Sequence, residues 1–302
     1  MKVSVIIVTY NTRQMTSECI DSVFEKTQDV DFEVVLVDNA SADGSRDFFA
    51  KDSRIKYIYS EKNLGFGGGN NLGYKYATGD FIFLLNSDTL LVNNAIKEFC
   101  AYMRKAPQNV GCLGCVMQDK YGNRIHSYHS TFPTLLWIFK EIICVSIPKI
   151  YNPYKAREKK QSKDKYPMKV AVITGADLFI RRTVIEKCGL FDTAFFMYYE
   201  ETEMQHRFLQ KGYEAWVIDT PKIIHLAGAS SKDKKHFLQK IAMPLKSRFI
   251  FAYKIYSPMQ ICVFRLMHLM MAPRILLSFT SWQNKKRILQ IIFGTYKNFS
   301  RK

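Results

Sequence analysis

Hydrophobic and polar positions in the first 118 residues alternate between short β-branched runs and longer segments with helical spacing. The runs predict buried strands at Val3–Thr9, Phe32–Val37, Ile55–Tyr59 and Phe81–Leu85. Helices are predicted in the gaps, at residues 12–26, 44–50, 67–77 and 93–105. Strands that alternate with helices are typical of βαβ units, so the pattern predicts an α/β fold with a mainly parallel central sheet.

This alternation stops between residues 126 and 169, where an apolar stretch is followed by a basic, proline-containing one. We interpret this segment as an insertion. Beyond it, the pattern predicts strands at Val170–Thr174, Leu178–Arg181 and Ala215–Ile218, and a helix over Glu200–Lys211 that Gly212 ends. We therefore predict one α/β domain over residues 1–233, with the insertion at 126–169, and a helical appendage over residues 234–302.

The net charge of +17 is concentrated in that appendage. Residues 234–302 contain 14 of the 44 Lys and Arg residues and none of the 27 acids, so residues 1–233 hold 30 basic residues against 27 acids. Basic residues alternate there with aromatic and aliphatic ones, which suits an anionic membrane surface. Helices packed on the domain with a solvated basic side are the alternative. Nucleic-acid binding is not expected, because the domain is nearly neutral and contains no recognised nucleic-acid module.

The cysteines and the apolar segments indicate a cytoplasmic protein. Seven scattered Cys residues suit a reducing compartment, and the pair Cys112 and Cys115, on a predicted strand, should point to opposite faces as buried thiols. The chain starts directly on a strand, so no cleavable signal peptide is expected. A spanning helix is not expected either, because the most apolar stretch, Ile261–Thr280, contains Arg265 and other polar residues.

Polar residues follow three of the predicted strands, at the ends where open α/β sheets bind ligands. They are Thr9 and Asn11 after the first strand, Asp38 after the second, and Asn86–Asp88 after the fourth. The glycines of Gly65–Gly69 are not a dinucleotide-binding fingerprint, because that motif belongs in the first strand–helix turn, which has no glycine here. We expect them to let the backbone approach a ligand closely.

Nine segments carry a resemblance to a known family. They are Val3–Asn11, Val37–Ser45, Asn63–Gly73, Leu85–Asp88, Gly175–Arg182, Gly189–Asp192, Phe195–Glu201, Arg207–Gly212 and His225. In this order they closely resemble inverting glycosyltransferase family 2, especially bacterial rhamnosyltransferase-like members of cell-envelope polysaccharide synthesis, over about residues 3–231. The resemblance implies a GT-A fold, a UDP- or dTDP-linked nucleotide-sugar donor, a divalent cation (Mg²⁺ or Mn²⁺), and a saccharide or polyprenyl-linked saccharide acceptor.

For the donor, the resemblance implies that Asp38 accepts the imide N–H of uracil or thymine, with Thr9 and Asn11 lining the same base pocket. An Asx turn is the structural alternative for Asp38. Asn70 and Asn71 are expected to reach the pyrophosphate or the sugar, although they could equally cap the local helix.

For the metal, Asn86-Ser87-Asp88 stands at the position of the family's DxD-like motif. Residues two apart in an extended segment share a face, so Asn86 and Asp88 should point the same way. Asp88 is expected to hold the cation and Asn86 to contact the donor sugar, with modest metal affinity because Asn86 is neutral. His225 stands where the family often has a histidine near the metal or diphosphate; a purely structural histidine is the alternative.

For catalysis, the acids that open the helix at 200–211 are separated by helical geometry. Glu201 lies roughly 40° from the centre of the Met204/Phe208 apolar stripe and Glu203 about 120° away, so Glu201 should face inward and Glu203 solvent. The family usually has Glu-Asp here, with the second acid as base, whereas this chain has Glu201. Glu201 is therefore expected to take the proton of an acceptor hydroxyl in an inverting displacement.

Two rival interpretations stay open: a non-catalytic sugar-nucleotide-binding protein and a nucleotidyltransferase on a related fold. Retention of Asp38, Asp88 and Glu201 argues against the first, and the segment Phe195–Glu201 argues against the second. We expect the protein to act on the cytoplasmic side, peripherally on the inner face of the plasma membrane.

Overall fold

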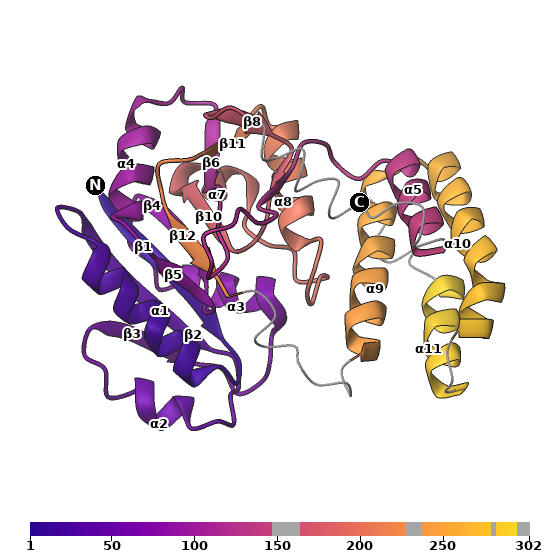
Figure 1. Ribbon diagram of the computed structural model, residues 1–302, viewed down its shortest axis with the longest axis horizontal. Helices are drawn as coiled ribbons and strands as arrows, with labels where there is room; N and C mark the ends of the chain where they lie inside the picture. Colours follow the sequence, from indigo (N-terminus) through magenta and orange to yellow (C-terminus); the bar gives the residue numbers. More distant parts are fainter. Residues whose placement is uncertain (147–163, 227–236, 279–281, 295–302) are drawn as a thin grey trace. The chain divides into compact units, whose positions relative to one another are not determined.

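The computed structural model describes residues 1–146, 164–226, 237–278 and 282–294 (Figure 1). The chain divides into two compact units. The first unit comprises residues 1–132, 158–193 and 201–232, and the second comprises residues 133–157, 194–200 and 233–302. Much of the predicted insertion thus groups with the C-terminal helices, and its residues 147–163 lie outside the described part of the chain.

The first unit is built on an eight-stranded sheet of order β3-β2-β1-β4-β10-β6-β11-β8. Its strands are β1 (Lys2–Thr9), β2 (Asp31–Asp38), β3 (Ile55–Tyr59), β4 (Phe81–Asn86), β6 (Val110–Cys115), β8 (Met168–Val170), β10 (Asp177–Arg181) and β11 (Glu214–Ile218). The first four neighbours are all parallel, as the sequence predicted, whereas β10 is antiparallel to both β4 and β6.

Successive side chains of a strand point to opposite faces of the sheet, and both faces are apolar here. Helices therefore cover both faces. The helices are α1 (Arg13–Lys26), α2 (Ser45–Phe49), α3 (Gly65–Tyr74), α4 (Ala95–Lys105), α7 (Arg182–Cys188) and α8 (Glu200–Gln210). One core contains Val5 of β1 with residues of α1 and α4, and the other contains Ile6 with residues of α7 and α8. Cys112 and Cys115 of β6 enter different cores, and burial raises the pKa of both thiols, which confirms the prediction of buried thiols on opposite faces.

Two glycines of α3 lie directly against the sheet. A Cβ on Gly69 would lie 2.7 Å from a methyl group of Val8, and one on Gly73 would lie 2.5 Å from a methyl group of Ile6. These two glycines therefore allow α3 to pack directly on β1. Gly69 is the one of the two that belongs to the run Gly65–Gly69, and its close approach in this structure is to the sheet.

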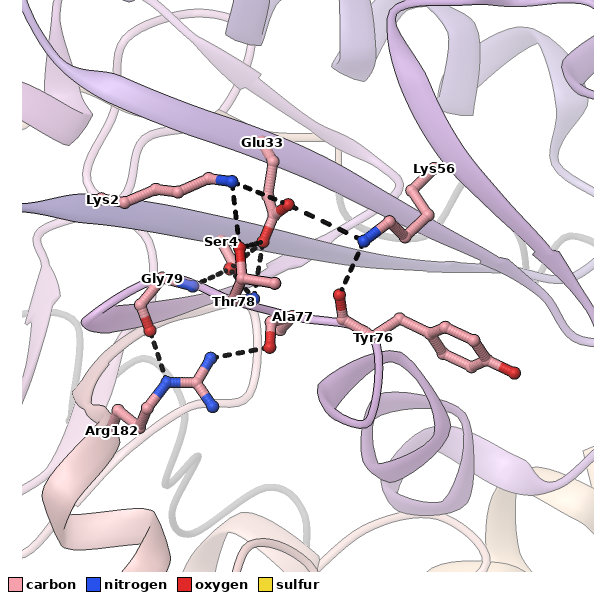
Figure 2. A network of polar contacts seen from close by, with 9 residues as sticks. All are labelled: Lys2, Ser4, Glu33, Lys56, Tyr76, Ala77, Thr78, Gly79 and Arg182. Atoms are coloured by element: carbon pink, nitrogen blue, oxygen red, sulfur yellow. Dashed lines mark hydrogen bonds and ion pairs between the residues drawn. The ribbon is translucent and has the colours of Figure 1, made fainter.

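A polar network joins the amino ends of β1 and β2 to the turn before β4 (Figure 2). At its centre, a Glu33 carboxyl oxygen of β2 accepts hydrogen bonds from the Ser4 hydroxyl (2.6 Å) and from the backbone N–H of Thr78 (2.7 Å). The Lys2 ammonium lies 3.1 Å from the other oxygen. Arg182 of α7 closes the network from the far side, because its guanidinium donates to the carbonyl oxygens of Ala77 and Gly79.

This network keeps Glu33 ionised. Burial alone would raise the pKa of Glu33, but the hydrogen bonds from Ser4, Thr78 and Lys2 outweigh it and lower the pKa from 4.5 to about 2. The folded protein therefore stabilises the ionised form of Glu33 much more strongly than the unfolded chain does.

Two small antiparallel sheets complete the first unit. β5 (Thr89–Leu91) pairs with β12 (Ile223–His225), and β7 (Tyr128–His129) pairs with β9 (Val172–Ile173). The sequence pattern predicted neither pairing, because both join very short strands that lie far apart along the chain.

The second unit contains helices with a shared core of aromatic and aliphatic side chains. Its described helices are α5 (Leu135–Ser146), α9 (Phe237–Ile255), α10 (Pro258–Ser278) and α11 (Trp282–Phe293). Phe249 of α9 contacts Phe264 and His268 of α10, with ring centroids 4.8 and 5.0 Å apart. His268 is fully buried, and its Nδ1–H donates to the Phe264 carbonyl at 2.8 Å. Within the described ranges, no helix combines the length and the apolar character needed to cross a bilayer.

We predict that Glu33→Gln lowers the free energy of unfolding at pH 7 by about 3 kcal/mol, which corresponds to the difference between the folded and unfolded pKa values. Because the folded-state pKa is depressed, this contribution is complete above pH 4.5 and is lost as the pH falls towards 2. Urea unfolding at several pH values measures the difference. Glu25→Gln, on an exposed side chain of α1, is the matched control and should change stability by less than about 0.5 kcal/mol. Equal stability of the two variants would show that the network does not stabilise the fold.

Candidate active site

The predicted donor residues meet at the carboxyl edge of the sheet. Thr9 pairs with Asp38 in the register of β1 and β2, and Val8 pairs with Asn86 in the register of β1 and β4. Parallel strands place their carboxyl ends at the same edge, so the ends of β1, β2 and β4 lie side by side there.

A chain of hydroxyl groups links two of these strand ends. The Thr9 hydroxyl lies 2.8 Å from that of Thr16 and 3.0 Å from that of Thr12, and the Thr12 hydroxyl lies 3.3 Å from that of Ser87. Thr9 itself is fully buried. The turn after β1 is thereby joined to the Asn86–Asp88 turn after β4, and Thr9 acts in the structure as part of this support.

Asn11 has a left-handed backbone conformation, with φ 54°, in the turn after β1. Its backbone N–H donates to the Ser41 hydroxyl at 3.0 Å, and its side-chain oxygen accepts the N–H of Ala42 at 2.7 Å. Asn tolerates this conformation better than most residues do. Asn11 therefore joins the turns that follow β1 and β2, on the exposed side of the strand ends.

Asp38 is fully buried at the end of β2, and both carboxyl oxygens have partners. One accepts the N–H of Ser41 at 2.8 Å, and the other accepts the Tyr57 hydroxyl at 2.8 Å. The Ser41 contact is a local turn of the Asx type, which the sequence analysis named as the structural alternative for Asp38. A carboxylate has lone pairs for further donors, so these contacts orient Asp38 without exhausting it. Tyr57, on β3, was missed because nothing in the strand pattern distinguishes its hydroxyl.

Asn70 and Asn71 both bind protein backbone. The Asn70 amide donates to the Phe66 carbonyl one turn earlier in α3, at 3.0 Å. The Asn71 amide donates to the Phe191 carbonyl at 2.7 Å and accepts the Phe191 N–H at 3.1 Å, across 120 residues of sequence. Neither residue is a helix cap, and Asn71 has a role that no local motif could indicate: it holds the segment after α7 against α3.

Asp88 and His225 form a polar pair at this edge. The His225 Nε2 lies 3.1 Å from an Asp88 carboxyl oxygen. The backbone positions them, because β5 pairs with β12 in a register that matches Thr89 with His225, and the Leu226 N–H donates to the Asp88 carbonyl at 2.8 Å. The fold therefore brings together the two residues predicted for the metal, which are 137 residues apart in the sequence.

The donor set of this pair fits a divalent cation. A carboxylate oxygen and an imidazole nitrogen are ligands that Mn²⁺ accepts, whereas Mg²⁺ prefers oxygen alone. Among the described residues no third His, Cys, Asp or Glu joins the pair. The protein would therefore supply two ligands and leave the remaining positions to phosphate oxygens and water.

Asn86 is held through its backbone. Its N–H donates to the Ala176 carbonyl at 3.0 Å, and its own carbonyl accepts the Thr89 hydroxyl at 2.7 Å. Within the described part of the chain, the Asn86 side chain makes no hydrogen bond, so the amide is available at the partly exposed end of β4.

Asp177, the first residue of β10, was missed by the sequence reasoning. Its side chain is fully buried, and one carboxyl oxygen accepts the Cys115 N–H at 2.5 Å, while the other has no hydrogen-bond partner among the described residues. Burial raises the pKa of Asp177 to about 7, partly opposed by the Cys115 hydrogen bonds and by His225. The available signal was an acid inside the apolar run Ala176–Ile180.

Glu201 lies in the first turn of α8 and is partly buried. Gln205, one turn later on the same face, binds both the N–H and the carbonyl of Ile173 at 2.8 Å. Ile173 is three residues before Ala176, the backbone partner of Asn86. This face of α8 is therefore tied to the end of β9, and the turn that follows β9 contacts the backbone of Asn86. Burial raises the pKa of Glu201, which makes it a stronger base than an exposed glutamate.

Glu203 does not face solvent, and this prediction was wrong. Its side chain is only 6% exposed, and it forms an ion pair with Arg207 at 2.8 Å. Arg207 also donates to the carbonyl oxygens of Cys188, Gly189 and Leu190. We expected α8 to bury one face only, whereas the loop after α7 covers a second face, where Glu203 and Arg207 lie.

A family model described as Glycosyl transferase family 2 matches residues 4–189. The chain is similar to the low-salt glycan biosynthesis hexosyltransferase Agl10 of Haloferax volcanii, with 25% identity over 84% of this chain and 76% of that protein. It is also similar to the UDP-Glc:alpha-D-GlcNAc-diphosphoundecaprenol beta-1,3-glucosyltransferase WfgD of Escherichia coli, with 34% identity over 34% of this chain and 41% of that protein. In five further glycosyltransferase relatives the match spans 15–37% of their own length, well under half.

Among solved structures, the chain resembles the mannosyltransferase PcManGT from Pyrobaculum calidifontis in complex with GDP-Man and Mn²⁺. The TM-score is 0.56 at 14% identity, over 96% of this chain and 85% of that one. At this identity the likeness concerns the fold alone. The predicted fold class is confirmed: an α/β fold of GT-A type with a mainly parallel central sheet and a helical C-terminal region.

We predict that Glu203→Gln lowers the free energy of unfolding by about 1–3 kcal/mol, because Arg207 would keep its charge in a mostly buried place without a charged partner. Urea unfolding followed by circular dichroism measures the change. The matched control is Glu186→Gln on an exposed position of α7, which should stay within about 0.5 kcal/mol of the unmodified chain. If the two variants were equally stable, the ion pair would contribute nothing to folding.

Proposed function

The chain belongs to glycosyl transferase family 2, and we propose that it transfers one sugar from a nucleotide-sugar donor to a hydroxyl of a glycan or lipid-linked saccharide, with inversion at the anomeric carbon. The observation that carries this proposal is the Asp88–His225 pair at the carboxyl edge of the sheet, beside the ends of β1 and β2. Open α/β sheets bind their ligands at this edge.

The donor is proposed to be linked to UDP or dTDP. Support comes from Asp38, a buried acceptor that Ser41 and Tyr57 orient and that can accept the imide N–H of uracil or thymine. The name of WfgD specifies a UDP-linked donor, although PcManGT was crystallised with a GDP-linked one. Asn86, whose side-chain amide is available, is proposed to contact the donor sugar. The contacts of Thr9, Asn70 and Asn71 favour a supporting role, in which they hold the turns that surround the donor.

Asp88 and His225 are proposed to hold a divalent cation, and the mixed oxygen and nitrogen donor set favours Mn²⁺ over Mg²⁺. A bound cation would neutralise the charge that develops on the departing diphosphate. The protein's part is to keep the two ligands together, which the β5–β12 pairing does through the backbone.

Glu201 is proposed as the general base. Its raised pKa favours proton uptake, and its place in the first turn of α8 lets the helix dipole stabilise the carboxylate before it reacts. When the acceptor hydroxyl attacks the anomeric carbon from the face opposite the diphosphate, Glu201 would take its proton. One such displacement inverts the anomeric configuration.

The acceptor is proposed to be a saccharide or a polyprenyl-linked saccharide of cell-envelope polysaccharide synthesis, at the cytoplasmic face of an anionic membrane. The name of WfgD includes a diphosphoundecaprenol acceptor, and that of Agl10 refers to glycan biosynthesis. The 14 basic residues without an acid in residues 234–302 support association with an anionic surface.

We predict that Asp88→Ala lowers sugar transfer at least about 10²-fold, because the cation would lose its carboxylate ligand. Calorimetric titration of donor with and without Mn²⁺ should show that the cation-dependent part of donor binding is also lost. Asp47→Ala, an exposed position of α2, is the matched control and should keep both properties. Full activity of Asp88→Ala, or full activity of the unmodified chain in excess chelator, would rule out the metal role.

We predict that Glu201→Gln lowers the transfer rate about 10²–10⁴-fold while donor binding is retained, because the substitution keeps the shape of the side chain and removes the proton acceptor. In the unmodified enzyme, the rate should fall as the pH drops through a pKa above that of an ordinary glutamate. The control is Glu203→Gln in the same helix, which should turn over at a near-normal rate at temperatures where it is folded. A slow Glu203→Gln beside a normal Glu201→Gln would reverse the assignment.

A further inference from the structure

Helix α10 exposes a continuous apolar face. We call it the α10 stripe: Met259, Cys262, Val263, Leu266 and Met270. The four large residues are 77, 42, 56 and 74% exposed in chain order. At about 100° per residue, all five positions fall within roughly 100° of the helix circumference. Exposed apolar residues are usually scattered singly on a soluble domain, so a stripe of this kind marks an interaction surface.

The stripe cannot turn inward, because the opposite face of α10 is already packed. Phe264 and His268 are fully buried against Phe249 of α9, and their own rings lie 4.3 Å apart. Arg265 is bound on the flank, where its guanidinium donates to the Tyr253 hydroxyl and to the Gly294 carbonyl. These contacts fix the rotation of the helix and hold the stripe outward.

The charge of the surrounding chain favours a lipid surface as the partner. No acid occurs from residue 234 to residue 302, and α11, which packs against α10, exposes Lys286 and Arg287. α11 also exposes Trp282 and Phe293, at 70% and 59%. Apolar residues combined with cations and aromatic side chains complement an anionic membrane surface, where the apolar groups enter the acyl boundary and the cations remain at the headgroups.

We propose that α10 lies in the plane of an anionic membrane and inserts the α10 stripe into the boundary between headgroups and acyl chains. The inference deepens the proposed membrane association and rests on it. The stripe runs for about 16 Å along one side of the helix, which requires the helix axis to lie flat on the surface. Salt-sensitive attraction brings the basic unit to the membrane, and burial of the stripe retains it there.

The experiment measures co-sedimentation of the full chain with vesicles of phosphatidylcholine and phosphatidylglycerol, and with vesicles of phosphatidylcholine alone. Leu266→Glu places one charge in the stripe, and we expect the partition coefficient on the mixed vesicles to fall at least about tenfold. Gln260→Glu is the matched control: it adds the same charge to an exposed position of the same helix, about 120° away. Gln260 accepts the Ser257 N–H at the start of α10, a contact that Glu preserves, so partitioning should change less than about threefold.

A second measurement reports insertion directly. An environment-sensitive fluorophore on Cys262, with Cys144 and Cys188 changed to Ala, should shift to the blue on adding mixed vesicles. Quenchers in the lipid should reach it, and aqueous iodide should not. Equal partitioning of Leu266→Glu and Gln260→Glu, or a label that iodide still quenches, would overturn the proposal.

The remaining outcomes separate this inference from its premises. If high salt releases all of the unmodified chain from mixed vesicles, the electrostatic association stands and insertion is wrong. If the chain binds neither kind of vesicle, both are wrong. If the chain is a dimer without lipid and Leu266→Glu makes it a monomer, the stripe covers a second copy and the membrane proposal falls. Glycosyl transfer to a soluble acceptor should be equal in Leu266→Glu and Gln260→Glu, so a failure of the proposed activity would show independently in both.

Discussion

The parallel pairing of β1 with β2 and β4 is the constraint on which the candidate active site depends. Thr9, Asp38 and Asn86 end these strands, and a slip of one residue would turn a strand's last side chain to the other face of the sheet. The network around Glu33 holds the opposite ends, because its hydrogen bonds join β1, β2 and the turn into β4. An ionised carboxylate in a partly buried place accepts only well-aligned donors, so this contact helps to define the register, and the register decides which side chains reach the carboxyl edge.

Much of the first unit could be predicted from the sequence, because its central strands are buried on both faces and therefore appear as uninterrupted apolar runs. The same pattern located the polar residues at the strand ends. It could not indicate which of them meet. Asp88 and His225 are 137 residues apart, and their contact depends on the pairing of two three-residue strands, which have no periodic signal. For this pair the family resemblance supplied what periodicity could not.

The contacts that the sequence did not reveal share a physical cause: each depends on a segment that lies elsewhere along the chain. Asn71 was expected to reach the pyrophosphate or the sugar, or to cap its helix, and nothing in its own segment indicated the hydrogen bonds to the backbone of Phe191. Glu203 was assigned to solvent because one helix stripe was taken as the only buried face. Asp177 was overlooked because a strand pattern counts apolar positions and does not show that one acid among them is fully buried. In each case the deciding contact comes from another segment that packs on the element. The element's own sequence does not indicate that segment.

The exposed face of α10 could not be predicted from its own sequence either. The helix is apolar around most of its circumference, so its sequence has no amphipathic period that could distinguish a buried face from an exposed one. The distinction comes from the neighbouring helices: Phe249 of α9 packs on Phe264 and His268, while Leu266 and Met270 stay exposed. Lys286 and Arg287 are exposed cations on α11, so attraction and burial arise from different side chains. Salt screens exposed charges beyond about 10 Å at 0.1 M and leaves apolar burial nearly intact, which is why the two contributions to membrane association can be separated in one molecule.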